Sequence, residues 1–247
     1  MIYAAMTDAG MIRGSNEDSF KVIEALDGLP WMFVIADGVG GHNAGEVASH
    51  IAVEEACRYI MANKSMLADG RQTNLEHVTS QVFTHVNASI YNASNEENNL
   101  RRMATTLTLV FAYENNLFIG HVGDSRVYLI DNEGIIRITR DHSYIEELLN
   151  NGAITIEEAR NHPERNKITR AVGYEPHVKP DIYTCIAKDG SFLLMCTDGL
   201  THMVEEEEIR KIILESAKPE EACDRLVKTA NENGGKDNIT VIVAKFD

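Results

Sequence analysis

Hydrophobic residues follow two different periods along this chain, and each period predicts one type of element. Apolar positions three or four residues apart predict amphipathic helices over Ala44–Met61 and Leu75–Tyr91, and again over Glu206–Ser216 and Glu220–Asn231. Apolar runs that end at turn residues predict strands, and Trp31–Ala36 is the clearest of them. The chain is therefore predicted to combine two pairs of helices with many strands.

Further segments have the composition of β-strands and are separated by turn residues. They are Met1–Thr7, Ser19–Ala25, Thr105–Tyr113, Leu117–Val122, Arg126–Ile130, Ile135–Thr139, Pro180–Ala187, Ser191–Thr197 and Ile239–Phe246. Because hairpins should join most of these strands, the sheets should be mainly antiparallel. Two helix pairs on the outside of two packed sheets is then the economical layering. Since no repeat or linker interrupts the pattern, residues 1–247 should form a single domain of the α+β class.

Turn chemistry suggests which strands pair. Glu114–Asn116 and Asp131–Gly134 have the residues of hairpin turns. We also expect Ser19–Ala25 to pair with the N-terminal strand, and Pro180–Ala187 to form a hairpin with the strand that follows it.

Four aspartates lie at the ends of predicted strands: Asp37, Asp124, Asp198 and Asp237. A buried carboxylate is costly unless a positive charge meets it, and several carboxylates gathered at one edge would repel one another. Hard divalent cations such as Mg²⁺ and Mn²⁺ prefer oxygen ligands and would relieve this repulsion. The pattern predicts metal-assisted chemistry on an oxygen-rich substrate.

Composition narrows the classes of partner. The chain has 247 residues, 44% of them hydrophobic, and a net charge of −15, which is typical of a globular protein and disfavours binding to duplex nucleic acid. No apolar run approaches the ~18 residues of a membrane span, and the first residues do not resemble a signal peptide. The four cysteines are far apart, which predicts reduced core residues in a cytoplasmic protein.

Five polar segments carry the candidate chemistry: Arg13–Asp18, Asp37–Glu46, Gly120–Arg126, Thr197–Leu200 and Gly234–Asn238. Each alone would be interpreted as a turn. The glycines of the second segment allow the backbone to approach a ligand closely and free a carbonyl to act as a further oxygen ligand. The chain contains neither a Walker A sequence nor the cysteine loop of cysteine-based phosphatases.

Together with Thr105-Thr106-Leu107 and Thr169-Arg170-Ala171-x-Gly173, these segments resemble the metal-dependent protein phosphatase family, the type 2C serine/threonine phosphatases, in its compact bacterial form. The resemblance extends from Thr7 to Val243 and implies an αββα four-layer sandwich with metals in a cleft at one end. One departure is Ala104, where the family usually has glycine, and we expect it to affect packing rather than chemistry.

The resemblance implies a set of ligands for two Mn²⁺ or Mg²⁺ ions. Asp37 should bridge the two ions, and Asp198 and Asp237 should complete the first. The Gly38 carbonyl should bind the second ion, with Glu17 reaching it directly or through water. Two such ions can lower the pKa of a shared water, so that a metal-bridging hydroxide attacks phosphorus.

Other acidic and amide residues have supporting roles or real alternatives. Relatives place a weaker third ion at Asp124 together with Asp198, but Asp124 could instead cap backbone amides or pair with Arg126. Asp18 should hold a neighbouring backbone group or a metal-bound water, and Asn238 should orient its neighbour Asp237.

The resemblance also implies residues that contact the substrate. Arg13 should grip the phosphate, because a guanidinium can hold two phosphate oxygens. His42 is the candidate proton donor to the leaving serine or threonine oxygen. The polar stretch from 142 to 173, with short helices expected at Tyr144–Asn150 and Ile156–Asn161, should be a flap that gates substrate entry; otherwise it is an ordinary surface insertion.

The implied function is hydrolysis of phosphoserine and phosphothreonine in proteins by a monomeric enzyme that opposes a bacterial serine/threonine kinase. Two alternatives remain open at this point. A hydrolase of small phosphate esters would use the same ions with a different substrate pocket. A binding module of the same fold with weak catalysis would sense a phosphorylated partner, although the acids at 37, 198 and 237 argue against it.

Overall fold

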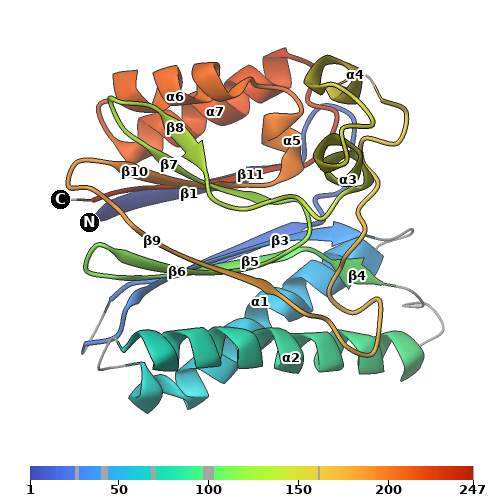
Figure 1. Ribbon diagram of the computed structural model, residues 1–247, viewed down its shortest axis with the longest axis vertical. Helices are drawn as coiled ribbons and strands as arrows, with labels where there is room; N and C mark the ends of the chain where they lie inside the picture. The colour runs from blue at the N-terminus through green and yellow to red at the C-terminus, as the bar shows by residue number, and fades with distance from the viewer. Residues whose placement is uncertain (26–27, 40–43, 68–70, 97–102, 161, 247) are drawn as a thin grey trace.

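Two β-sheets pack face to face in the computed structural model, and a pair of helices covers the outer face of each sheet (Figure 1). The structure describes residues 1–25, 28–39, 44–67, 71–96, 103–160 and 162–246. Every strand pair with an assigned register in this part of the chain is antiparallel. The predicted α+β class and αββα layering are confirmed.

The first sheet has five strands and the second has six. The first contains, in spatial order, β1 (Ile2–Asp8), β11 (Ile239–Lys245), β10 (Phe192–Cys196), β7 (Arg126–Ile130) and β8 (Ile135–Arg137). The second contains β2 (Asp18–Ile23), β3 (Trp31–Val39), β5 (Leu107–Tyr113), β6 (Asn116–Val122) and β9 (Asp181–Ile186), with β4 (Ala104–Thr105) beside β3.

Helices α1 (Ala44–Ala62) and α2 (Gln72–Glu96) cover the second sheet, and α6 (Glu206–Glu215) and α7 (Pro219–Glu232) cover the first (Figure 1). The shorter helices are η1 (Lys64–Met66), α3 (Tyr144–Asn150), α4 (Ile156–Arg160) and α5 (Asp198–Thr201). Over the described residues, no helix combines the length and the hydropathy that crossing a bilayer requires.

Two predicted strand pairings are wrong. The strand over Ser19–Ala25 pairs with β3, while the N-terminal strand pairs with β11 in the other sheet. The connection over residues 9–17 allows this, since packed sheets are only ~10 Å apart and an extended chain covers ~3.3 Å per residue. Pro180–Ala187 forms no hairpin with the next strand, because β9 pairs with β6 and β10 pairs with β7 and β11.

Burial explains why β9 and β10 separate. β9 alternates between half-buried and exposed positions, as a strand at the edge of a sheet does, whereas all five residues of β10 are buried. A fully buried strand needs a neighbour on each side, and β7 and β11 supply them. The two hairpins with turns at Glu114–Asn116 and Asp131–Gly134 form as predicted.

The core between the sheets joins residues far apart in sequence. Its buried side chains include Phe33 and Ile35 of β3, Met195 of β10 and Ile242 of β11. Burial of each such side chain contributes ~1.5–3 kcal/mol. This shared layer fixes the two sheets relative to each other, and with them the strand ends that carry the aspartates.

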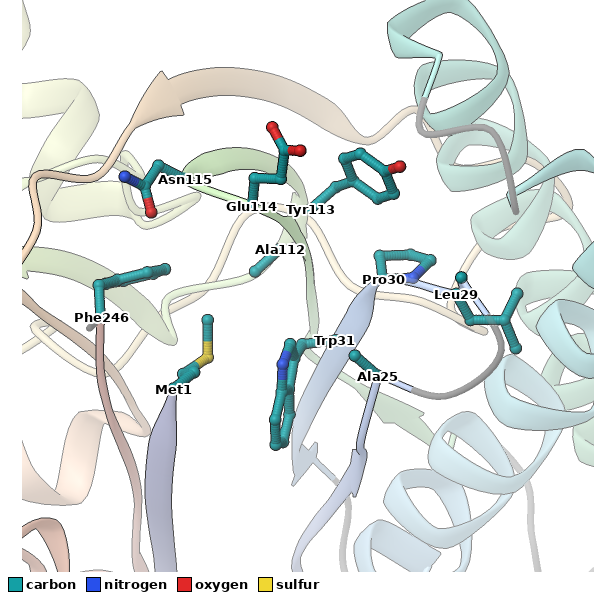
Figure 2. Close-up of a pocket in the computed structure, with 11 residues that line it drawn as sticks. Met1, Ala25, Leu29, Pro30, Trp31, Ala112, Tyr113, Glu114, Asn115 and Phe246 are labelled. Atoms are coloured by element: carbon teal, nitrogen blue, oxygen red, sulfur yellow. The ribbon is translucent and has the colours of Figure 1, made fainter.

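A largely apolar cavity of about 360 Å³ lies at the end of the sandwich that holds the start of β3 (Figure 2). Trp31, Met1 and Phe246 line it, so it lies where β3 and β1 begin and β11 has ended. Asp37 is six residues further along β3, which is ~20 Å in a strand. The cavity in Figure 2 is therefore remote from the predicted catalytic residues.

Candidate active site

A polar cavity of about 260 Å³ lies at the opposite end of the sandwich from Trp31, where β3 ends and α5 begins. The residues that line it are Arg13, Glu17, Asp37, Gly38, Val39, Asp124, Asn166, Ile168, Asp198, Asp237 and Asn238. All six predicted metal ligands, Arg13 and Asn238 are therefore together. Asp18 is buried beneath them, and His42 lies outside the described residues.

Asp37 is held by its backbone. Its N–H donates to Thr106 Oγ1 at 2.9 Å, and its carbonyl accepts from the Thr106 N–H and from Thr105 Oγ1, each at 2.8 Å. This reciprocal contact fixes the direction in which the carboxylate leaves β3. This contact could not be predicted from the sequence, although the two threonines belong to the Thr105-Thr106-Leu107 motif.

The aspartates form an electrostatically unfavourable group. Burial, together with the negative charges of Asp18, Asp198 and Asp124, raises the pKa of Asp37 well above its ordinary value. Burial also raises the pKa of Asp124 and of Asp198, and the charge of a neighbouring aspartate adds to each shift. Such a group binds protons or metal ions readily, because either one removes the repulsion.

Two of the carboxylates contact cationic or ionisable side chains. Arg13 Nη2 donates to Asp237 Oδ2 at 2.8 Å, and His202 Nδ1 lies 3.3 Å from Asp198 Oδ2. Among the described residues, no three Asp, Glu, His or Cys side chains converge as a ligand group. The carboxylates therefore line the cavity without meeting at a common point.

The backbone at Gly38 leaves no room for a side chain. A Cβ there would lie 2.1 Å from the carbonyl oxygen of Gly45 and 2.7 Å from that of Glu17. A Cβ at Gly45 would lie 2.6 Å from Glu17 Oε2. These glycines let β3, the start of α1 and the Glu17 carboxylate meet closely. Close approach of this backbone to a ligand stays a prediction.

Asp18 supports the group from below. It faces Asp37 across the β2–β3 pair, and its Oδ2 accepts hydrogen bonds from Thr197 Oγ1 at 2.9 Å and Thr240 Oγ1 at 2.7 Å. Burial, opposed by these hydrogen bonds, raises the pKa of Asp18 to about 7. Its Oδ1 is buried and without a partner. An orphaned carboxylate oxygen and an all-oxygen donor set fit a hydrated hard cation.

Asn238 ties three segments together. Its Oδ1 accepts from the Glu17 N–H at 2.8 Å, and its Nδ2 donates to the carbonyls of Ala9 and Ser15 at 3.0 and 2.9 Å. Its own N–H donates to Asp237 Oδ1 at 2.9 Å. These contacts agree with the orienting role expected for Asn238 and position Glu17 as well.

Arg126 does not bind Asp124 in this structure. Its guanidinium donates to Asp141, with Nη2 to Oδ2 at 2.6 Å and both Nε contacts at 3.0 Å, and to Tyr128 Oη at 3.2 Å. The alternative in which Asp124 pairs with Arg126 is therefore not seen, because Arg126 binds Asp141 and Tyr128 instead. Asp124 remains on the wall of the cavity, where a metal-ligand role stays a prediction.

The segment from 142 to 173 lies beside the site. Asn166 and Ile168 contribute to the wall of the cavity, and Ile168 forms an isolated β-bridge with Ser143. The two short helices expected in this segment are α3 and α4. Its location agrees with a flap, while its gating role stays a prediction. The sequence did not indicate Asn166 or Ile168, because neither belongs to a chemical motif.

Comparison with known proteins places this geometry among related enzymes. The family model described as "Protein phosphatase 2C" matches residues 13–240. The chain is similar to a serine/threonine phosphatase stp of Listeria monocytogenes, with 38% identity over 98% of this chain and 94% of that one. It is also similar to the protein phosphatase PhpP of Streptococcus pneumoniae, with 34% identity over 100% of this chain and 98% of that one.

Solved structures give the same result. The serine/threonine phosphatase PstP/Ppp of Mycobacterium tuberculosis superposes with a TM-score of 0.86 at 35% identity, over 100% of this chain and 98% of that one. Stp1 of Staphylococcus aureus gives a TM-score of 0.89 at 33% identity, over 99% and 94%. The catalytic domain of PstP in complex with two manganese ions gives 0.83 at 34% identity, over 100% and 98%.

Proposed function

Because the chain belongs to the protein phosphatase 2C family and is a serine/threonine protein phosphatase, we propose that the cavity between Arg13 and Asp124 is its active site. The observation that carries this assignment is the group of buried and partly buried aspartates with raised pKa values that line one polar cavity. Such clustering is expected where the chemistry requires cations.

The family is metal-dependent, and we propose two Mn²⁺ or Mg²⁺ ions in this site. The ligands would be Asp37, Asp198, Asp237, the Gly38 carbonyl and Glu17, and a weaker third ion would bind Asp124 with Asp198. When bound, such ions lower the pKa of coordinated water and offset negative charge on the phosphoryl group. Arg13 pairs with Oδ2 of Asp237, so a bound ion and Arg13 would compete for this carboxylate.

Arg13 lies at the mouth of the cavity with its side chain half exposed. Once released from Asp237, its guanidinium can donate to two phosphate oxygens in a planar, bidentate contact. This contact orients the phosphoryl group over the aspartates, and transfer of a phosphoryl group depends mostly on such positioning and electrostatic stabilisation. Arg13 is thus assigned to substrate binding. The resemblance assigns His42, which lies outside the described residues, to protonation of the leaving oxygen.

Replacement of Arg13 by alanine should lower kcat/KM for phosphothreonine peptides about 100-fold, mainly through KM. Lysine should restore little, because it lacks the bidentate geometry. Kinetics at saturating Mn²⁺ separate this effect from altered metal binding. Arg58→Ala is the matched control, since Arg58 is 72% exposed and pairs with Glu55 on α1. An unchanged KM would contradict the assignment.

His42→Asn should reduce kcat about 100-fold with phosphothreonine peptides but little with p-nitrophenyl phosphate. An alkoxide leaving group needs a proton, whereas a nitrophenolate does not. His50→Asn on the exposed face of α1 is the control. Equal losses on both substrates would remove His42 as the acid.

We propose that the substrates are phosphorylated proteins of a bacterial cytoplasm, and that a serine/threonine kinase supplies them. A monomer is sufficient, since all the assigned residues come from one chain. Release of phosphate from a phosphothreonine peptide, measured with Mn²⁺ and with a chelator, tests this function. A much higher kcat/KM for small phosphate esters than for any phosphopeptide would favour the alternative.

A further inference from the structure

His142 makes a reciprocal pair of hydrogen bonds with Gly123, the residue immediately before Asp124. The His142 N–H donates to the Gly123 carbonyl at 2.7 Å, and the Gly123 N–H lies 3.1 Å from His142 Nδ1. His142 is 7% exposed. Because Nδ1 must accept a hydrogen bond, the ring is neutral and carries its proton on Nε2.

The other ring nitrogen reaches Asp181 on β9. His142 Nε2 lies 3.2 Å from Asp181 Oδ2, and Arg170 Nη1 donates to Asp181 Oδ1 at 2.7 Å and to the Lys179 carbonyl at 3.1 Å. Despite partial burial, the hydrogen bonds from Arg170 and His142 keep the pKa of Asp181 below its ordinary value. Asp181 therefore accepts from both residues as a carboxylate.

These contacts close both ends of the segment from 142 to 173. His142 begins it, Arg170 lies near its end, and the Thr169 N–H donates to the His142 carbonyl at 2.7 Å. The same network therefore joins the base of this segment to the corner that carries Asp124.

The turn between β6 and β7, which contains Gly123 and Asp124, is held tightly by its neighbours. Gly123 has a φ of +115°, and a Cβ there would lie 2.4 Å from Thr106 Cγ2. Thr106 is the residue that holds Asp37, and its Oγ1 lies 3.0 Å from Ser125 Oγ. A shift of Gly123 would therefore move Asp124 relative to Asp37.

We propose that His142 is a positioning residue for Asp124, which it holds through Gly123, and that Asp181 and Arg170 fix the imidazole for this task. The inference rests on the proposed role of Asp124 as a ligand of the weaker ion. Loss of the Gly123 contact then weakens that ion while leaving the two ions at Asp37 in place.

Two conservative substitutions test the contacts of the two ring nitrogens of His142 separately. The Oδ1 of His142→Asn stands where Nδ1 stood and can accept from Gly123, but the side chain is too short to reach Asp181. The amide of His142→Gln extends to the Nε2 position and can donate to Asp181, but it offers Gly123 no acceptor. Glutamine is closer to histidine in volume, so a merely structural role would favour the Gln variant, which is the opposite of the order expected here.

Calorimetric titration of the metal-free full-length chain with Mn²⁺ provides a readout besides activity. We expect His142→Gln and His142→Ala to raise the Kd of the weakest binding phase about tenfold and to leave the tight phase unchanged. His142→Asn should stay closer to the wild-type Kd. The loss of kcat/KM in His142→Gln and His142→Ala should be recovered at high Mn²⁺, which would not repair a folding defect.

His85→Asn is the matched control, because His85 also contacts a carboxylate, Glu55, at 2.9 Å, but on α1 and α2. Equal Kd values for the Asn and Gln variants, or a wild-type titration without a weaker phase, would overturn the inference. Shifted Kd values in a protein that dephosphorylates no phosphopeptide would refute the proposed function and leave the inference standing.

Discussion

Asparagine at position 37 should reduce kcat/KM for phosphothreonine peptides by about 1000-fold or more at any Mn²⁺ concentration, a loss of ~4 kcal/mol of transition-state stabilisation. Asp37 is partly buried and lies within the electrostatic influence of Asp18, Asp198 and Asp124, and it is the predicted bridge between both ions. A neutral amide of the same shape keeps the backbone contacts to Thr106 but cannot neutralise two cations. Steady-state kinetics over a Mn²⁺ series measure the effect.

The same substitution should have the opposite effect on the metal-free fold. Removal of one like charge from the group relieves repulsion, so Asp37→Asn should unfold at the same or a higher temperature than the wild type in a chelator. In the wild type, Mn²⁺ at 100 times its Kd adds ~2.7 kcal/mol. The variant should lose most of this gain.

Asp224→Asn on the exposed face of α7 is the control for both measurements, since it removes an equal charge away from the site. Near-normal Mn²⁺-dependent turnover in Asp37→Asn would refute the metal assignment. A metal-free variant much less stable than the wild type would show instead that the Asp37 carboxylate supports the fold.

Without metal, the wild-type protein should become less stable as the pH rises from 6.5 to 7.5. Burial raises the pKa of Asp18 to about 7, and those of Asp37 and Asp124 lie well above their ordinary value. In the unfolded chain these carboxyls are ionised throughout this range, so the native state binds more protons. Each excess proton lowers the free energy of unfolding by ~1.4 kcal/mol per pH unit.

Below pH ~6.5, buried histidines change the free energy of unfolding in the opposite direction. Burial lowers the pKa of His121 to about 3 and also lowers that of His142, so their contribution to stability is lost as the pH falls below ~6.5, where unfolded histidines gain a proton. Above that pH the aspartates dominate. Metal-ion binding requires ionised carboxylates, so the stabilisation by Mn²⁺ should grow over the same range.

Thermal melts at pH 6.5, 7.0 and 7.5, with a chelator or with Mn²⁺, test this expectation. The metal-free midpoint should fall by about 3 °C or more per pH unit. Asp37→Asn should show a shallower fall, because it removes one of the proton sites. A metal-free midpoint that rises or stays level would mean that the carboxyls are ionised in the native protein.

The sequence located the strands better than it predicted their partners, although β3 continues through Asp37 to Val39 rather than ending at Ala36. Asp37 and Asp198 are recognisable because an apolar run stops at an acid followed by glycine, which is a local feature. The separation of β9 from β10 depends on which strands have a buried neighbour on each side, and this is decided by the whole sandwich. The same turn sequence, here Asp189-Gly190, can therefore connect two paired strands of a hairpin or two strands that lie in different sheets.

The hydroxyl contacts around the aspartates could not be anticipated either. Thr197 and Thr240 lie 43 residues apart and meet at Asp18 only because β10 pairs with β11 and β2 lies against them. The sequence identified Asp18 as a supporting residue, but its depth of burial, and with it the pKa of about 7, follows from tertiary packing. Short α5 was missed because one helical turn shows no periodicity.

The assigned ligands come from both sheets: Asp37 and Gly38 lie on β3, while Asp198 and Asp237 flank β10 and β11. Ions bound by all of them would link the two sheets at this end, in addition to the apolar layer between the sheets and the hydrogen bonds from Thr197 and Thr240 to Asp18. A shift of one sheet relative to the other would then change the distances between the metal ligands. A substitution that changes side-chain shape in the shared core layer, at Phe33 or Met195, can therefore misalign the assigned metal ligands in a molecule that is still folded.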